Sequence, residues 1–177
     1  DEGALGRAGE EAAPARVVEL PAPAVAVACG ESHTVVLLAG GRVFAWGAYR
    51  DCEGHQHFAG GAPGGAPSHS SSVIAGGAPG GAPEGGTPPC CPVQMVLGSG
   101  GGGGGGSPAV VAIASGANHA VAVDDEGRLW AWGVDEQGQL GLGSGDGTAA
   151  TFVPQATRVP VRASAGGAEL RVRAVGC

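Results

Sequence analysis

Hydrophobic residues in this chain are gathered into short runs of four or five positions, each bounded by glycine or polar residues. Runs of this length are typical of β-strands, because a helix needs a longer segment with apolar positions three and four apart. We find no such helical periodicity along the chain. Glycine-containing turns at Gly40-Gly41 and Glu126-Gly127 predict tight hairpins between neighbouring runs. The expected strands are Val25–Ala28, Thr34–Leu38, Val43–Trp46, Val111–Ala114, Ala120–Val123 and Leu129–Trp132.

The pattern of runs and turns occurs more than once. The segment from Val25 to Gly47 returns without a gap from Val111 to Gly133, so every matched position is displaced by 86 residues. Both copies carry G-x-x-H, followed by G-R-h-h-x-W-G in which h is apolar. A third copy is expected to begin at residues 173–177, which match residues 25–29. The matched pairs are Gly30 with Gly116, His33 with His119, Gly41 with Gly127, Trp46 with Trp132, and Gly47 with Gly133.

Two low-complexity segments lengthen the repeat. Residues 60–87 carry Gly-Gly-Ala-Pro units and residues 99–106 are nearly pure glycine, so we expect both to be flexible. Without these inserts the period is about 50 residues, which is typical of a four-stranded propeller blade. The expected division is an upstream linker (1–15), a first blade (16–59), a Gly/Ala/Pro-rich insert (60–87), a returning strand (88–98), a polyglycine linker (99–107), a second blade (108–143), and a connecting strand with the start of a third repeat (144–177).

A fourth strand is expected where another apolar run follows each meander. Pro92–Val96 would complete the first blade and Phe152–Ala156 the second, with Val17–Leu20 as their counterpart ahead of the first copy. The prediction is an all-β chain, a partial β-propeller of two four-stranded blades and the start of a third. Such a piece cannot close a ring and leaves strand edges exposed. We therefore expect it to belong to a longer protein and to be marginally stable alone.

The charge balance restricts the classes of partner. Nine Lys and Arg against sixteen Asp and Glu give a net charge of -7. This charge argues against a nucleic-acid-binding protein that contacts phosphate groups along its whole surface. No apolar run approaches the roughly 20 residues of a membrane-spanning helix, so we expect a soluble protein without a membrane partner. The five cysteines favour a reducing intracellular compartment. Cys29 and Cys177 occupy the same repeat position and are expected to be small buried residues.

These motifs resemble the repeat of the regulator of chromosome condensation family. The resemblance lies in the shared G-x-x-H and G-R-h-h-x-W-G segments and in Gly-Gln-Leu-Gly at 138–141. It covers roughly residues 16–58, 92–97 and 108–142. It implies a seven-bladed β-propeller, of which this chain would hold two blades and part of a third. It also implies a nuclear location with contact to histones or chromatin, a cytoplasmic location being the alternative.

A second, local resemblance concerns function. After the first Trp-Gly, the chain reads Ala-Tyr-Arg-Asp-Cys-Glu-Gly, which is similar to an aromatic-Arg-Asp-x-x-Gly segment in the exchange-factor branch of the family. The resemblance implies a guanine nucleotide exchange factor for a Ran-type small GTPase, with no cofactor, metal or small-molecule substrate. There the segment leads into a β-wedge that presses on the GTPase, although here the tip departs from the pattern at residues 55–58. By resemblance, the GTPase-facing residues are Glu31, Arg50, Asp51, Gly54 and Asn118.

Several of these features also have a structural interpretation. His33 and His119 recur with the blade, so we expect them to make structural hydrogen bonds rather than transfer protons. The repeat glycines are expected at turns and close strand approaches. Trp46 and Trp132 are expected to pack between blades, where a large flat ring fills the space between stacked sheets.

A propeller that only holds protein partners is the alternative function, and Arg50 and Asp51 would then form an exposed ion pair without a functional role. The sequence contains no nucleophile elbow or phosphate-binding loop motif that would indicate bond-making chemistry. His55, His57 and His69 do not indicate a metal site, because glycine-rich surroundings would not fix ligand geometry. An ordered, projecting hairpin over residues 50–58 would favour nucleotide exchange, whereas a segment that merges into the insert would favour a scaffold.

Overall fold

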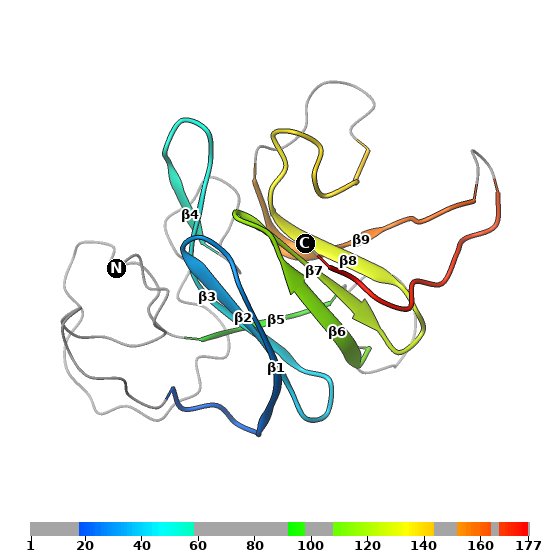
Figure 1. Ribbon diagram of the computed structural model, residues 1–177, viewed down its shortest axis with the longest axis horizontal. Helices are drawn as coiled ribbons and strands as arrows, with labels where there is room; N and C mark the ends of the chain where they lie inside the picture. Colours follow the sequence, from blue (N-terminus) through cyan, green and yellow to red (C-terminus); the bar gives the residue numbers. More distant parts are fainter. Residues whose placement is uncertain (1–17, 59–91, 98–107, 144–151, 164–166, 177) are drawn as a thin grey trace.

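The computed structural model describes residues 18–58, 92–97, 108–143, 152–163 and 167–176 (Figure 1). Every regular element in these ranges is a β-strand, and they contain no helix long and apolar enough to cross a membrane. The two predicted inserts lie outside the described residues. The strands are β1 (Ala24–Cys29), β2 (His33–Leu38), β3 (Val43–Arg50), β4 (Gln56–Phe58), β5 (Val93–Met95), β6 (Val110–Ser115), β7 (His119–Asp124), β8 (Leu129–Val134) and β9 (Phe152–Val159).

The first sheet is antiparallel and contains β1 to β5. Strands β1, β2 and β3 form the predicted meander, in which His33 lies opposite Gly47 and Leu37 opposite Val43. The outer edge of β3 is shared, since β5 pairs with its first half and β4 with its second half. The returning strand β5 therefore completes the first blade, as the apolar run at residues 92–96 predicted.

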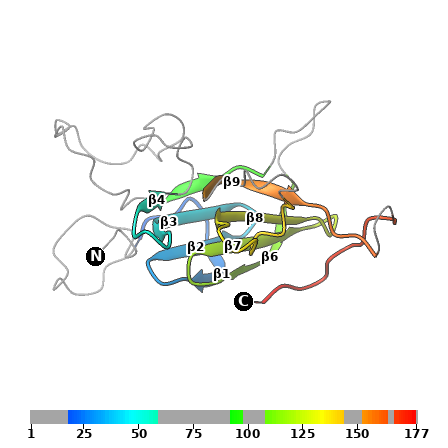
Figure 2. The ribbon, with the colours of Figure 1, turned by 90° about the horizontal axis from the view of Figure 1, so that it is seen from above.

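The second sheet repeats this plan in the order β6-β7-β8-β9. His119 lies opposite Gly133, and both sheets have a register irregularity at the same place in their first strand. The β2–β3 and β7–β8 turns place Gly41 and Gly127 at φ of 79° and 77°, in the left-handed region that favours glycine. The strands of the two sheets follow the same order, from β1 to β5 in the first sheet and from β6 to β9 in the second (Figure 2). The predicted all-β architecture of two repeated four-stranded antiparallel blades is confirmed.

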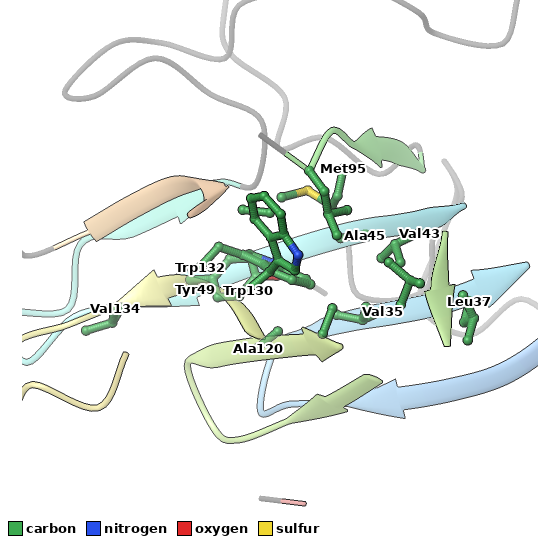
Figure 3. Packing of buried hydrophobic residues seen from close by; sticks show 14 residues of the cluster. Val35, Leu37, Val43, Ala45, Tyr49, Met95, Ala120, Trp130, Trp132 and Val134 are labelled. Carbon is green, nitrogen blue, oxygen red and sulfur yellow. The ribbon is translucent and has the colours of Figure 1, made fainter. Parts of the chain in front are cut away.

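The main hydrophobic core lies between the two sheets. Side chains from both sheets, including Val35, Ala45, Tyr49 and Trp130, meet there (Figure 3). Trp132 is fully buried at this interface, and its indole Nε1 donates a hydrogen bond to the Tyr49 hydroxyl at 2.9 Å. Burying one large apolar side chain contributes roughly 1.5–3 kcal/mol, so this shared cluster holds the two blades together.

The two repeat tryptophans lie in different surroundings. Trp132 packs between the described blades as predicted, whereas Trp46 lies on the face of the first sheet that points away from the second. There Trp46 packs near Val18, Leu20 and Ala22 of the preceding segment. For Trp46 the packing between blades stays a prediction, because no second blade of the described residues lies on the side of the first sheet that Trp46 faces.

Two predictions near the start of the described chain are wrong. Residues 18–20 form no strand, since no described strand lies beside them to pair with their backbone, and they cover the β2–β3 face with side chains instead. Cys29 is exposed rather than buried. It lies at the end of β1, the strand that also exposes Val25 and Val27, because nothing in the described residues covers this part of the sheet. The matching prediction for Cys177 lies outside the described residues.

The beginning of the third repeat is visible in its backbone contacts. The Val172 N–H donates to the Gly127 carbonyl at 2.8 Å, and the Val110 N–H donates to the Gly41 carbonyl at 2.9 Å. Val110 lies immediately before the second copy at residues 111–133, and Val172 holds the corresponding place immediately before residues 173–177. Residues 167–176 therefore contact the second blade as the start of the second repeat contacts the first, although they form no strand.

Candidate functional site

The repeat motif G-x-x-H forms one end of each blade, and the candidate site projects from this end of the first blade. The His33 ring is buried, stacks on Tyr49 with ring centres 4.0 Å apart, and its Nε2 lies 2.6 Å from Ser115 Oγ of the second sheet. A Cβ added at Gly30 would lie 2.1 Å from His33 Cε1, so glycine is required where the ring crosses the loop. Desolvation, with a smaller effect of His119, lowers the pKa of His33 to about 4. His33 is therefore a neutral structural group that joins the blades.

His119 holds the same position in the second blade. A Cβ at Gly116 would lie 2.2 Å from His119 Cε1, so the motif has the same steric reason in both copies. Desolvation lowers the pKa of His119, and the nearby charge of Asp135 opposes that shift. The expectation that both histidines serve the architecture agrees with this geometry.

The candidate site is the hairpin formed by β3, the turn after it, and β4. It projects from one end of the first sheet (Figure 1). Strand β3 has eight residues, whereas its counterpart β8 has six. The turn after β3 therefore lies two residues further along the strand direction than the turn after β8. The turn itself follows the repeat: Gly54 N–H donates to the Asp51 carbonyl, as Gly138 N–H does to that of Asp135. Gly54 has φ of 85°, which the turn requires of it.

Asp51 organises the hairpin from inside. One carboxylate oxygen accepts backbone N–H groups from Glu53 at 3.0 Å and His55 at 2.8 Å. The other lies 3.1 Å from His55 Nδ1 and 2.8 Å from His57 Nε2. The Asp51 side chain is only 6% exposed, so these contacts replace the water that would otherwise solvate it.

The pKa of Asp51 follows from these contacts. Desolvation favours the neutral acid, but hydrogen bonds from His57 and His55 outweigh it and lower the pKa of Asp51 to about 2. The carboxylate is therefore charged at neutral pH and holds both histidines. Residues 55–57, where the sequence departs from the exchange-factor pattern, supply the groups that keep this hairpin closed.

The hairpin is also held by the second sheet. The His57 ring stacks on Phe152 of β9, with ring centres 4.6 Å apart and an angle of 18° between planes. Phe152 in turn lies 5.8 Å from the Tyr49 ring, measured between centres. Aromatic contacts of this kind add about 0.5–1.5 kcal/mol beyond burial. One continuous set of rings therefore runs from the blade interface to the hairpin.

Three of the five residues that sequence reasoning assigned to the partner-facing side come together at this end. Asn118, in the β6–β7 loop, accepts the Arg50 N–H through Oδ1 at 2.8 Å, and its Nδ2 donates to Glu31 at 3.3 Å. Glu31 lies exposed in the β1–β2 loop, and its N–H donates to the Ala117 carbonyl at 2.9 Å. Glu31, Arg50 and Asn118 thus form one polar group across both blades, next to the turn of Asp51 and Gly54.

Sequence reasoning missed a second contact of the hairpin. The Cys52 N–H donates to Glu136 Oε2 at 2.9 Å, and its thiol donates to Oε1 at 3.1 Å. The only available signal was that Glu136 follows the aspartate of the matching turn in the second repeat. Within the residues that the structure describes, no group of three or more histidine, cysteine and acidic side chains could hold a metal ion. Glu31, Glu53 and Glu136 make this end of the blades acidic.

Known proteins share this repeat. Two family models described as "Regulator of chromosome condensation (RCC1) repeat" match residues 24–51 with 110–139, and 126–177. The chain is 36% identical to the mouse protein named regulator of chromosome condensation, over 80% of this chain and 26% of that protein. It is 34% identical to the human protein of the same name, over 94% of this chain and 34% of that protein. The chain therefore spans about a quarter to a third of these relatives.

A solved structure shows the same fold. The Prp20p protein of Saccharomyces cerevisiae, described with its binding properties to Gsp1p and histones, superposes with a TM-score of 0.52 at 21% identity. The match covers 83% of this chain and 28% of that one. Repeat motifs, blade topology and these matches agree, and the chain belongs to the regulator of chromosome condensation repeat family.

Proposed function

We propose that the protein is a guanine nucleotide exchange factor for a Ran-type small GTPase, and that the hairpin of residues 50–58 presses on the surface of the GTPase. The observation that carries the proposal is the hairpin itself, which is ordered through β4 and projects beyond the sheet (Figure 1). Its Arg-Asp-x-x-Gly sequence is the part of the chain that resembles the exchange-factor branch of the family.

The proposed mechanism uses binding energy and makes no covalent bond. A hairpin that binds the nucleotide-free GTPase more tightly than the loaded form shifts the equilibrium toward nucleotide release. Such discrimination needs an element that keeps its shape against the partner. Asp51 and Gly54 supply that shape, through the carboxylate contacts and the left-handed turn. No cofactor, metal or small-molecule substrate takes part.

The remaining proposed partner contacts lie beside the hairpin. Arg50 and Glu31 are exposed at this end of the blades, and Asn118 is half-buried between them. We assign all three to the GTPase-facing side together with Asp51 and Gly54. An exposed arginine at the centre of an interface is a frequent source of binding energy.

We also propose a nuclear location with contact to chromatin. The support is the naming of the relatives for chromosome condensation and the description of the yeast protein with histones. Histones are basic, and the net charge of -7 of this chain complements such a surface.

Release of labelled GDP from Ran by the full-length protein tests the proposal. We expect acceleration by the native protein and a loss of about tenfold or more with Arg50→Ala or Asp51→Ala. Arg42→Ala is the matched control, since Arg42 is an exposed arginine at the opposite end of β3. A folded native protein that leaves GDP release unchanged would exclude this function and leave a scaffold for protein partners.

A further inference from the structure

The extension of β3 carries backbone N–H groups past the end of its partner strand β2, which β8 does not do in the second described blade. Strand β2 begins at His33, so β3 runs past its partner after Gly47. The next N–H on that side, from Ala48, donates to the Ser32 carbonyl at 2.8 Å. In the second blade, the Val134 N–H makes the equivalent bond to the Asn118 carbonyl at 2.8 Å, and the strand ends there.

In the first blade the chain continues, and two more backbone donors follow. Arg50 comes two residues after Ala48 at the end of β3, where alternate N–H groups point to the same edge, and Cys52 follows in the turn after the strand. No strand of the described residues is available to pair with them on this edge. Arg50 and Cys52 are exposed, so their N–H groups are open to water as well as to a neighbouring side chain.

Side chains of the second blade supply both acceptors. Asn118 Oδ1 accepts from Arg50 at 2.8 Å, and Glu136 Oε2 accepts from Cys52 at 2.9 Å. The Cys52 thiol also donates to Glu136 Oε1, and this bond, together with desolvation and neighbouring negative charges, raises the pKa of Cys52. The thiol thus remains a donor at neutral pH, and Glu136 holds Cys52 by both oxygens.

The orientation of the Asn118 amide is fixed by a third residue. Its Nδ2 faces Glu31 at 3.3 Å, which leaves Oδ1 toward the Arg50 N–H. An aspartate at 118 would keep an acceptor for Arg50 but would place a second carboxylate beside Glu31. An asparagine, rather than an acid, is therefore the residue that satisfies both neighbours.

We propose that Asn118 and Glu136 are positioning residues, which hold the hairpin of the first blade at a fixed angle to the second blade by replacing the missing strand partner. The expected effect on nucleotide release rests on the proposed exchange function, whereas the placement of the hairpin by Asn118 and Glu136 does not depend on that function. Asn118 and Glu136 set where Arg50 and the turn meet a partner, and the second repeat becomes part of the hairpin's support.

The test measures hydrogen–deuterium exchange of single backbone amides in the full-length protein, together with GDP release from Ran. Glu136→Ala should speed exchange at the Cys52 amide about tenfold, and Asn118→Ala should do so at Arg50. Glu136→Gln, which keeps an acceptor oxygen, should restore most of the protection. Asp125→Ala is the matched control, because it removes an exposed carboxylate from the β7–β8 turn at the other end of the sheet.

For GDP release, we expect the two alanine variants to raise KM for the GTPase with a smaller effect on kcat, and Glu136→Gln to recover the native KM. Unchanged protection of both amides in folded alanine variants would overturn the proposal. Equal loss of protection throughout the first sheet would also overturn it, because the residues would then serve general stability. Local loss of protection in a protein that never accelerates GDP release would support the positioning role and reject the exchange function.

Discussion

The substitution Gly30→Ala is expected to be among the most damaging single-methyl additions in the chain. The new Cβ would lie 2.1 Å from His33 Cε1 and 2.7 Å from the Gly116 carbonyl oxygen. The His33 ring cannot move aside, because it is buried, stacked on Tyr49 and bonded to Ser115. Overpacking of this kind costs about 1–3 kcal/mol, and the displaced His33 bond adds about 1 kcal/mol. We expect a loss of about 3 kcal/mol in the free energy of unfolding.

The matching substitution in the second blade is the control. In Gly116→Ala the three nearest atoms all belong to the ring of His119, which is only half-buried, so shifting this ring disturbs less packing than shifting the buried ring of His33. We therefore expect Gly116→Ala to cost about 1 kcal/mol, well below Gly30→Ala. Urea unfolding followed by tryptophan fluorescence, extrapolated linearly to water, gives both free energies.

A double variant separates the ring contact from other effects. In a His33→Ala background the ring is absent, so adding Gly30→Ala should cost less than it does in the native protein, with only the Gly116 carbonyl still in the way. If Gly30→Ala costs the same in both backgrounds, or no more than Gly116→Ala, this explanation of the G-x-x-H motif is wrong.

Three further outcomes are expected. Tyr49→Phe leaves the buried Trp132 indole N–H without its acceptor and should cost about 1–3 kcal/mol in the same unfolding assay; a change near zero would show that the bond contributes nothing. Because the pKa of Asp51 is lowered in the folded state, its stabilisation of the hairpin is present above about pH 4 and is lost as the pH falls through about 2. Amide exchange of residues 51–57 should show this loss, and Asp51→Asn should remove the pH dependence. Arg158→Ala breaks an exposed pair with Glu169 and should change stability by less than about 1 kcal/mol, and a larger loss would mean that this pair anchors the third repeat.

The candidate site was only partly readable from sequence. The resemblance selected residues 50–54, and the structure gives that segment an ordered hairpin. The role of His55 and His57 in holding Asp51 could not be inferred, because it depends on how the turn folds the chain back on itself. Glu136 was missed because 84 residues separate it from Cys52, and only the packing of two blades brings them together.

The sequence by itself determined the repeat, the strands and the turns. Alternating short apolar runs and left-handed glycines are local properties, so the hairpins at Gly41 and Gly127 followed from them directly. The tertiary structure decided what surrounds each repeated residue. Trp46 and Trp132 are equivalent in sequence, yet one meets the preceding segment and the other a neighbouring blade. Burial and hydrogen bonding between blades depend on which surface lies opposite, and a repeat pattern contains no information about that.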